Sequence, residues 1–395
     1  MSHFEVIVVG LGAAGAATTY QLARRGSRVL GIDRFDPPHA LGSTHGDTRI
    51  TRLAIGEGSQ YSPLAIRSHE IWRELEAQTG AELLTQCGAL YIGPSADDSA
   101  VHGRAGFLTR TLESARAFDI PIEQLDAREV RRRFPVFNVQ EHERALFEPS
   151  AGFVRPEACV RQQLALAEVL GAGIHRDERF DGYDVDGSGL VHVRTSAGVY
   201  TADRLVLSVG AWIGGAVPPH LAKYFTVLRQ VLCWFDVRGD ISAFTPARCP
   251  VHIWSLANNH DIYGFPAVDG AAGGVKIADE QYSETTTADS VSRDVAVEYT
   301  RELFEQHVSR CFPDVVGQVL RTATCLYTVT PGFDFIIDTL PEQPQVLVVS
   351  PCSGHGFKHS AAIGESVASW ARDEVPSVSL SAFRAPWTTV RTRAP

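Results

Sequence analysis

The N-terminal segment combines apolar and small residues in an order that predicts a strand, a turn, a helix and a second strand. β-Branched residues lead into Gly10, Gly12 and Gly15, an alanine-rich helical pattern follows, and a second apolar run ends at Asp33. Glycines at such a turn let backbone N–H groups approach a pyrophosphate at the positive end of the helix. The pattern therefore favours dinucleotide binding over a merely structural tight turn.

This motif makes two predictions about a bound dinucleotide. Gly10, Gly12, Ala14 and Gly15 form the expected pyrophosphate turn, while Asp33, followed by Arg34, marks the ribose end. The motif does not separate FAD from NAD.

Helical and extended patterns alternate along the rest of the chain. Runs with helical periodicity are expected at 61–80, 107–120, 155–171, 289–312 and 361–374. Alternating runs between about 225 and 280 predict an antiparallel sheet, and apolar runs predict strands at 89–93, 190–210 and 346–350.

Composition narrows the class of protein. The chain has 395 residues with 44% hydrophobic and 21% charged, which is ordinary for a globular enzyme. A net charge of -10 argues against a nucleic-acid or anionic-membrane surface. The seven cysteines form no metal-binding spacing, so we expect reduced thiols, no metal and a cytoplasmic protein without export signal or membrane span.

Three later stretches carry candidate chemistry. The stretch GSTHGDTRITRLAIGEG, residues 42–58, holds His45, Arg49 and Arg52. If this segment is helical, the two arginines share one face, where they suit a carboxylate or an electron-rich ring. The alternative is a solvated loop with surface arginines.

The other two stretches contain a cysteine and a lysine. Cys325 and Tyr327 lie in TATCLYTVTPGFDFIIDTLPE, although a lone cysteine is usually a small buried hydrophobe. Lys358 lies in PCSGHGFKHS and is one of only three lysines among 36 basic residues. Because this loop follows a buried strand and precedes a helix, its N–H groups suit an anion, either a flavin edge or a substrate carboxylate. A helix-capping loop with a surface lysine is the alternative.

Taken together, these motifs resemble a known family. GLGAAG, STHGDTRITR, CLYTVTPGFDFIID and SGHGFK, in this order, are similar to monomeric sarcosine oxidase and N-methyltryptophan oxidase, within the D-amino-acid-oxidase-like FAD enzymes. The resemblance runs over essentially the whole chain.

The resemblance implies roles around a flavin. Cys325 would attach FAD covalently through its sulfur, Arg49 and His45 would lie close to the ring, and Lys276 would help to reduce dioxygen near flavin N5. The remaining cofactor contacts would come from the pyrophosphate loop and the glycine-rich loop, namely Ser43, Thr44, Gly354, His355, Gly356 and Lys358.

The resemblance also implies a substrate site. Arg52 and Lys358 would hold a carboxylate, while Tyr263 and Phe265 would form aromatic walls near Tyr327. Three departures border this side: Ile55 stands where relatives usually have an aromatic residue, Glu280 where sarcosine oxidases have a histidine, and His359 where relatives often have an aromatic residue. An acid at 280 would either point away or meet a substrate with extra positive charge.

The implied fold is α/β (α+β overall), with a Rossmann-like FAD-binding domain and an inserted antiparallel-sheet substrate domain. The FAD-binding domain is expected at 1–85, 150–215 and 322–395, and the substrate domain at 86–149 and 216–321. We expect a monomer or small homo-oligomer that acts on a small amine.

The implied activity is FAD-dependent oxidation of a secondary (N-methyl or cyclic) amino acid to an imine, with reduction of O2 to H2O2. Within the class, the alternative is a bulkier amine or imino acid from specialised metabolism. Two alternatives belong to other classes of protein. One is an NAD-dependent dehydrogenase, in which Cys325 and Lys276 have no role, and the other is a flavin-binding protein without turnover.

Overall fold

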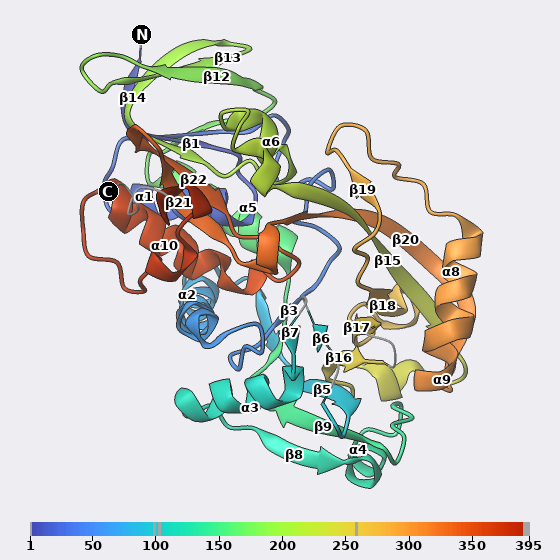
Figure 1. The fold of residues 1–395 in the computed structure, drawn as a ribbon. Helices are drawn as coiled ribbons and strands as arrows, with labels where there is room; N and C mark the ends of the chain where they lie inside the picture. Colours follow the sequence, from blue (N-terminus) through green and yellow to red (C-terminus); the bar gives the residue numbers. More distant parts are fainter. Residues whose placement is uncertain (1, 98–99, 102–103, 257–259, 390–395) are drawn as a thin grey trace.

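The computed structural model describes residues 2–97, 100–101, 104–256 and 260–389. Within these residues the chain forms two large sheets (Figure 1). One carries the N-terminal strand and the last long strand, and the other lies around the two longest strands. The predicted mixture of helices and strands is confirmed.

The first sheet has eight strands among the described residues. Its parallel part has the order β11-β2-β1-β14-β22. Antiparallel strands join only at the β14 and β22 end, where β13 pairs with β14, β12 with β13, and β21 with β22. The bounds are β1 His3–Val9, β2 Val29–Ile32, β11 Gly173–His175, β12 Phe180–Val185, β13 Val191–Thr195, β14 Gly198–Leu207, β21 Ile336–Leu340 and β22 Gln343–Ser350. Because the β1, β2, β14 and β22 strands run in one direction, their carboxyl ends meet at one edge, which is where ligands bind in such sheets.

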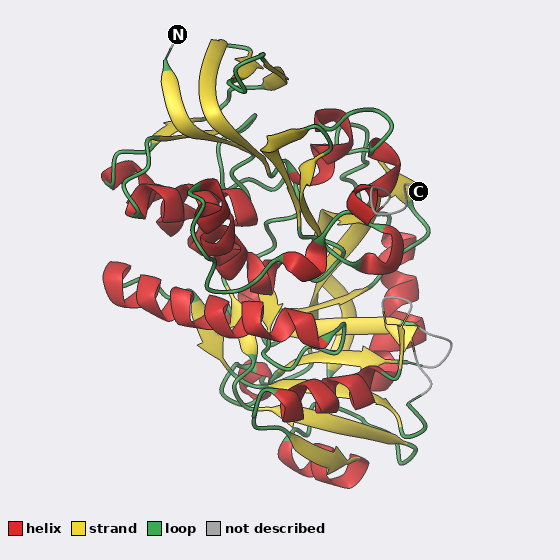
Figure 2. Ribbon diagram, turned by 60° about the vertical axis from the view of Figure 1, so that its left-hand side comes forward, coloured by secondary structure: helices red, strands yellow, loops and turns green. Residues whose placement is uncertain are grey.

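Helices pack beside this sheet and against each other (Figure 2). Helix α1, Ala13–Arg24, contacts both α10, Ser360–Ala371, and α5, Pro156–Val169. Helix α2, Ser62–Thr79, packs on α10. The close approach of α1 and α10 requires Gly364, because a Cβ there would lie 2.4 Å from the Cβ of Ala17. The predicted βαβ unit is therefore built with its helix buried against the C-terminal helix.

The second sheet has nine strands among the described residues. Its core is antiparallel: β15, Thr226–Val237, pairs with β18, Val275–Asp279, and β18 pairs with β17, Asp261–Phe265. The remaining members are β5 Ala89–Pro94, β8 Glu123–Asp126, β9 Glu143–Glu148, β16 Val251–Ser255, β19 Thr285–Thr286 and β20 Val315–Val329. The antiparallel sheet predicted between 225 and 280 is confirmed.

The two longest strands, β15 and β20, pair along almost their whole length. Figure 1 shows that they run from the neighbourhood of α6, Ile213–Ala216, to that of α9, Ser309–Cys311. The predicted domain boundary at residue 322 falls inside β20. The division into an FAD-binding and a substrate domain stays a prediction.

Shorter elements complete the fold. Helices α3 Phe107–Ala117, α4 Ala127–Arg133 and α8 Val297–Leu303 accompany the second sheet, and α8 continues through a π-helical turn into α9. A small sheet, ordered β3-β10-β4, joins segments that lie far apart in sequence, with bounds β3 Arg49–Thr51, β10 Gly152–Val154 and β4 Leu84–Gln86. Strands β6, Ala100–Val101, and β7, Arg104–Ala105, pair as a short hairpin.

Two secondary-structure predictions were wrong. The helix expected from 289 begins only at Val297, because side chains capture the carbonyl groups of the preceding segment: Arg229 donates to Ser292 and Asp294, and Thr324 donates to Arg293. These carbonyls are therefore not used by intrahelical N–H groups.

The segment after His45 is also not helical. Residues 49–51 form strand β3, which pairs with β10. Arg49 and Arg52 therefore do not share a helix face.

No helix of the described residues is long and apolar enough to cross a bilayer.

Candidate active site

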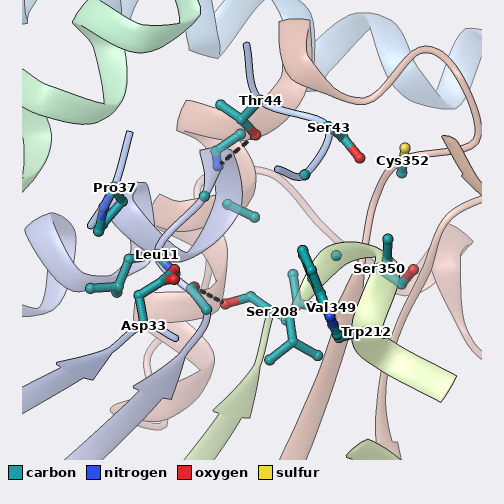
Figure 3. A pocket seen from close by; sticks show the side chains of 18 of the residues that line it. Leu11, Asp33, Pro37, Ser43, Thr44, Ser208, Trp212, Val349, Ser350 and Cys352 are labelled. Atoms are coloured by element: carbon teal, nitrogen blue, oxygen red, sulfur yellow. Dashed lines mark hydrogen bonds between the residues drawn. The ribbon is translucent and has the colours of Figure 1, made fainter. Parts of the chain in front are cut away.

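A cavity of about 330 Å³ lies at the carboxyl edge of the parallel strands (Figure 3). Its floor comes from the ends of β1, β2, β14 and β22, and the start of α1 faces it. Predicted cofactor residues in its lining are Gly10, Gly12, Ala14, Asp33, Arg34, Ser43, Thr44, Gly354 and Gly356. Gly15, Cys325, His355 and Lys358 are not among its lining residues.

The turn before α1 has room only for glycine. Gly10 has a φ of +86°, and a Cβ there would lie 2.5 Å from the carbonyl oxygen of Ser208. A Cβ on Gly15 would lie 1.7 Å from the oxygen of Gly10. Gly12 at the N-cap has no side chain to satisfy the first N–H groups, and Thr44 Oγ1 accepts only from Ala13 N, at 3.3 Å. This helix end is arranged to receive an anion.

The carboxylate of Asp33 is fixed at the end of β2. Its Oδ2 accepts from Leu11 N at 2.7 Å and its Oδ1 from Phe35 N at 2.9 Å (Figure 3 shows the first contact). Each oxygen keeps a further lone pair for a ribose hydroxyl. Arg34 is held by Asp289, with Nη1 2.7 Å from Oδ1, and its guanidinium lies over the ring of Phe35.

A second cavity of about 80 Å³ adjoins the first. Arg49, Tyr327, Gly354 and Phe357 line both cavities, so the two share a wall. The second cavity is also lined by the predicted substrate residues Arg52, Tyr263, Phe265, Glu280 and Lys358, together with His355. Geometry therefore brings together two basic side chains, two aromatic side chains and the predicted cofactor cavity.

Arg52 and Lys358 are almost fully buried beside this cavity. Arg52 Nη1 donates to the carbonyl of Ala54 at 2.7 Å, and Nη2 donates to Glu57. Lys358 Nζ donates to the carbonyl of His355 at 2.7 Å and lies 3.9 Å from Glu57 Oε1. Burial lowers the pKa of Lys358 to about 7, with Glu57 opposing the shift. The lysine thus changes its charge close to neutral pH.

Arg49 is the centre of the shared wall. Its Nη2 donates to the carbonyl of Ser43 at 2.9 Å and to the Sγ of Cys325 at 3.1 Å. His45 lies beside it, and burial together with the charges of Arg49, Arg293 and Lys276 lowers its pKa to about 3. The imidazole is therefore neutral at physiological pH.

Lys276 lies behind this wall and lines neither cavity. Its Nζ donates to the carbonyls of Gly46 and Thr48 at 2.8 and 2.7 Å and lies 3.9 Å from the ring centroid of Phe265. Burial and the charge of Arg49 hold its pKa well below the usual value.

Two tyrosines face each other at the junction of the cavities. Tyr327 OH donates to Tyr263 OH at 3.4 Å. Burial raises the pKa of both phenols, so both stay protonated. They can donate hydrogen bonds but cannot serve as a base at neutral pH.

Ile55, a predicted substrate residue, lies in the core. Ile55 is fully buried in the hydrophobic core around α1, α2 and α10 and is not among the lining residues of the second cavity. Its expected place beside the substrate is not supported by this geometry.

Sequence reasoning missed three acids of the site. Glu57 and Asp261 line the second cavity, and Glu148 accepts from the N–H groups of Leu53 and Ala54, which follow Arg52. Glu57 belongs to the stretch 42–58, so it could have been predicted as a partner acid for the two arginines of that stretch. Asp261 and Glu148 are far from this stretch in sequence and gave no such signal.

Comparison with known proteins decides the family. The family model described as FAD dependent oxidoreductase matches residues 5–370. The chain belongs to this family. It is 40% identical to a monomeric sarcosine oxidase of Streptomyces avermitilis over 92% of either chain. It is 36% identical to an N-methyl-L-tryptophan oxidase of Yersinia pestis over 96% of this chain and 98% of that protein. The prediction of a flavin-dependent amine oxidase is confirmed.

Solved structures support the fold of this FAD-dependent oxidoreductase. NikD, an unusual amino acid oxidase essential for nikkomycin biosynthesis, matches with a TM-score of 0.82 and 21% identity, covering 97% of this chain and 98% of that one. L-proline dehydrogenase from P. horikoshii matches with a TM-score of 0.80 and 18% identity over the full length of both chains.

The residues of the first cavity fit FAD. The uncapped start of α1 supplies N–H groups for a pyrophosphate, and Asp33 supplies a carboxylate for a ribose. Arg49 and Tyr327 lie where this cavity meets the second one, so the reactive end of the cofactor belongs at that junction.

Proposed function

We propose that this FAD-dependent amine oxidase acts on a secondary amino acid, uses O2 as electron acceptor and holds FAD through the sulfur of Cys325. The observation that supports this proposal is the shared wall. A cavity lined by two buried basic residues, Arg52 and Lys358, shares Arg49 and Tyr327 with the cofactor cavity.

Arg52 and Lys358 bind the substrate carboxylate. An arginine fork and an ammonium from two different segments suit the two oxygens of one carboxylate. Such a carboxylate competes with Glu57 for both cations. The amino nitrogen and its neighbouring carbon then lie toward the shared wall.

Tyr263 and Phe265 enclose the substrate and exclude water from the reacting atoms. No described side chain at the shared wall is a strong base at neutral pH, since the tyrosines stay protonated and His45 is a weak base. The substrate amine therefore has to react in its neutral form. FAD, when bound, supplies the two-electron oxidation of the C–N bond to an imine.

Arg49 places positive charge at the shared wall, and the amino group of Lys276 lies behind that wall. Such charge stabilises negative charge that develops during reduction of a flavin and of dioxygen. Arg49 also donates to the Sγ of Cys325, which keeps this sulfur beside the shared wall.

A substrate screen tests the proposal. Purified protein is incubated in air with sarcosine, N-methyl-L-tryptophan, L-proline and the matching primary amino acids, while hydrogen peroxide is measured. We expect peroxide from at least one secondary amino acid and much less from the primary ones. Turnover with a nicotinamide cofactor and no peroxide would contradict the proposal.

A further inference from the structure

Two carboxylates face each other across the hairpin that borders the substrate cavity. The register of β17 and β18 pairs Ile262 with Asp279, so Asp261 lies opposite Glu280. Glu280 N donates to the carbonyl of Asp261 at 3.1 Å. Directly opposite residues project their side chains to the same face of a sheet. Both residues also line the second cavity.

Two carboxylates in this arrangement make the β17–β18 side of the cavity attractive to a positively charged group. Asp261 is buried, and Tyr282 donates to Glu280 Oε2, which fixes that carboxylate at the cavity wall. A cationic group between the two acids would be attracted by both. The effect is strong because partial burial reduces screening by water.

The basic residues come from other elements. Lys358 belongs to the loop before α10, and Arg52 follows β3. Arg52 Nε is buried and has no hydrogen-bond partner among the described residues, so this guanidinium keeps a donor for an anion. The β17–β18 side of the cavity thus carries two carboxylates, while Arg52, Lys358 and their partner Glu57 lie on the β3 and α10 side.

We propose that the substrate is an N-alkylated basic amino acid, whose carboxylate binds Arg52 and Lys358 and whose side-chain ammonium binds Asp261 and Glu280. This inference rests on the proposed function and names its substrate class. A cavity of about 80 Å³ has room for a short side chain. Nα-methyl-L-ornithine is a suitable probe, and Nα-methyl-L-norleucine has nearly the same shape without the charge.

The test compares these two substrates. For the wild-type protein we expect kcat/KM to be at least about tenfold higher for the ornithine derivative, as one paired charge provides. Glu280→Gln and Asp261→Asn should each remove most of that preference, because kcat/KM should fall much more for the ornithine derivative than for the norleucine derivative. Glu302→Gln, an exposed acid on α8, is the matched control and should change nothing.

A binding measurement separates recognition from turnover. 5-Aminopentanoate and hexanoate have similar shapes and one carboxylate each, and neither has an α-amino group. Titration into the yellow holoenzyme should show tighter binding of 5-aminopentanoate by wild type and equal binding by Glu280→Gln. Flavin content and Tm show whether each variant is folded, and Glu280→Ala, which also removes the charge, replaces Glu280→Gln if that variant is not.

The outcomes distinguish the two proposals. Oxidation of sarcosine and the norleucine derivative without preference for the ornithine derivative overturns this inference and leaves the proposed function standing. Equal losses for both substrates in Glu280→Gln also overturn it, because the acids then serve the reacting amine. Failure to oxidise any secondary amino acid overturns the proposed function itself.

Discussion

Arg49 donates a hydrogen bond from Nη2 to the Sγ of Cys325 over 3.1 Å. The contact joins β3, a strand of the small three-stranded sheet, to β20, the longest strand of the nine-stranded sheet. It places a permanent positive charge against the one thiol that the family resemblance assigns to the flavin.

Cys325→Ser should abolish covalent attachment while FAD still binds, since the FAD cavity does not depend on this side chain. After acid precipitation, the yellow colour should stay with the wild-type pellet and move to the supernatant of the variant. Cys352→Ser is the matched control because Cys352 lines the FAD cavity but lacks the arginine contact. An FAD mass adduct on the intact Cys325→Ser chain would place the link elsewhere.

Lys276→Met should keep the flavin and slow its reoxidation by O2. Lys276 is a buried cation behind the shared wall, and removing one such electrostatic group typically costs about 100-fold or more in rate. Stopped-flow mixing of the reduced variant with oxygen measures the rate. Lys223→Met, at a distant lysine next to Tyr224, provides the control. An unchanged rate in Lys276→Met would remove this residue from the oxygen reaction.

Carboxylate binding should weaken as pH rises through about 7. Because burial lowers the pKa of Lys358 to about 7, its ammonium is present below that pH and lost above it. Hexanoate stays ionised throughout the range from pH 6 to 9, so its Kd should increase toward the alkaline side. In Lys358→Met, hexanoate should bind more weakly at every pH, and its Kd should no longer follow this titration. A pH-independent Kd in wild type would contradict the assignment.

Glu148→Gln should impair Arg52 without touching the substrate. Glu148 is fully buried and accepts from Leu53 N, Ala54 N and Tyr91 OH, and the ring of Tyr91 lies beneath the Arg52 guanidinium. The NH2 group of the new side-chain amide would face the N–H and O–H groups that donate to Glu148. This mismatch should lower the free energy of unfolding by about 1–3 kcal/mol. We expect KM for sarcosine to rise while kcat changes little.

Glu143→Gln distinguishes positioning from simple destabilisation. Glu143 is a buried carboxylate on the same strand that accepts from Trp254 Nε1 and Gln140 N, with no contact to the Arg52 segment. It should lower Tm to a similar degree and leave KM unchanged. Equal changes of KM in both variants would assign Glu148 a structural role only.

Much of the cofactor half could be predicted from sequence, because its signals are local. The glycines before α1 and the acid at the end of β2 stand within one βαβ unit, and the structure brings them to one cavity. The rarity of lysine also pointed to Lys276 and Lys358, both of which are buried.

The substrate half depended on long-range pairing that a sequence pattern does not contain. Asp261 meets Glu280 only through the register of β17 and β18, and Glu148 reaches Leu53 from the end of another strand. The expected helix between 289 and 296 was lost to side chains from β15 and β20 that capture its carbonyls. Tertiary contacts overrode the local propensity in that segment.

The central claim is that this chain oxidises a secondary amino acid with a bound flavin. Its most direct test is the visible spectrum of the purified protein, recorded anaerobically before and after addition of sarcosine or Nα-methyl-L-ornithine. We predict a yellow protein whose flavin absorbance is bleached by at least one of these substrates and returns when air is admitted. A colourless protein, or a yellow protein that no secondary amino acid bleaches, would contradict the claim.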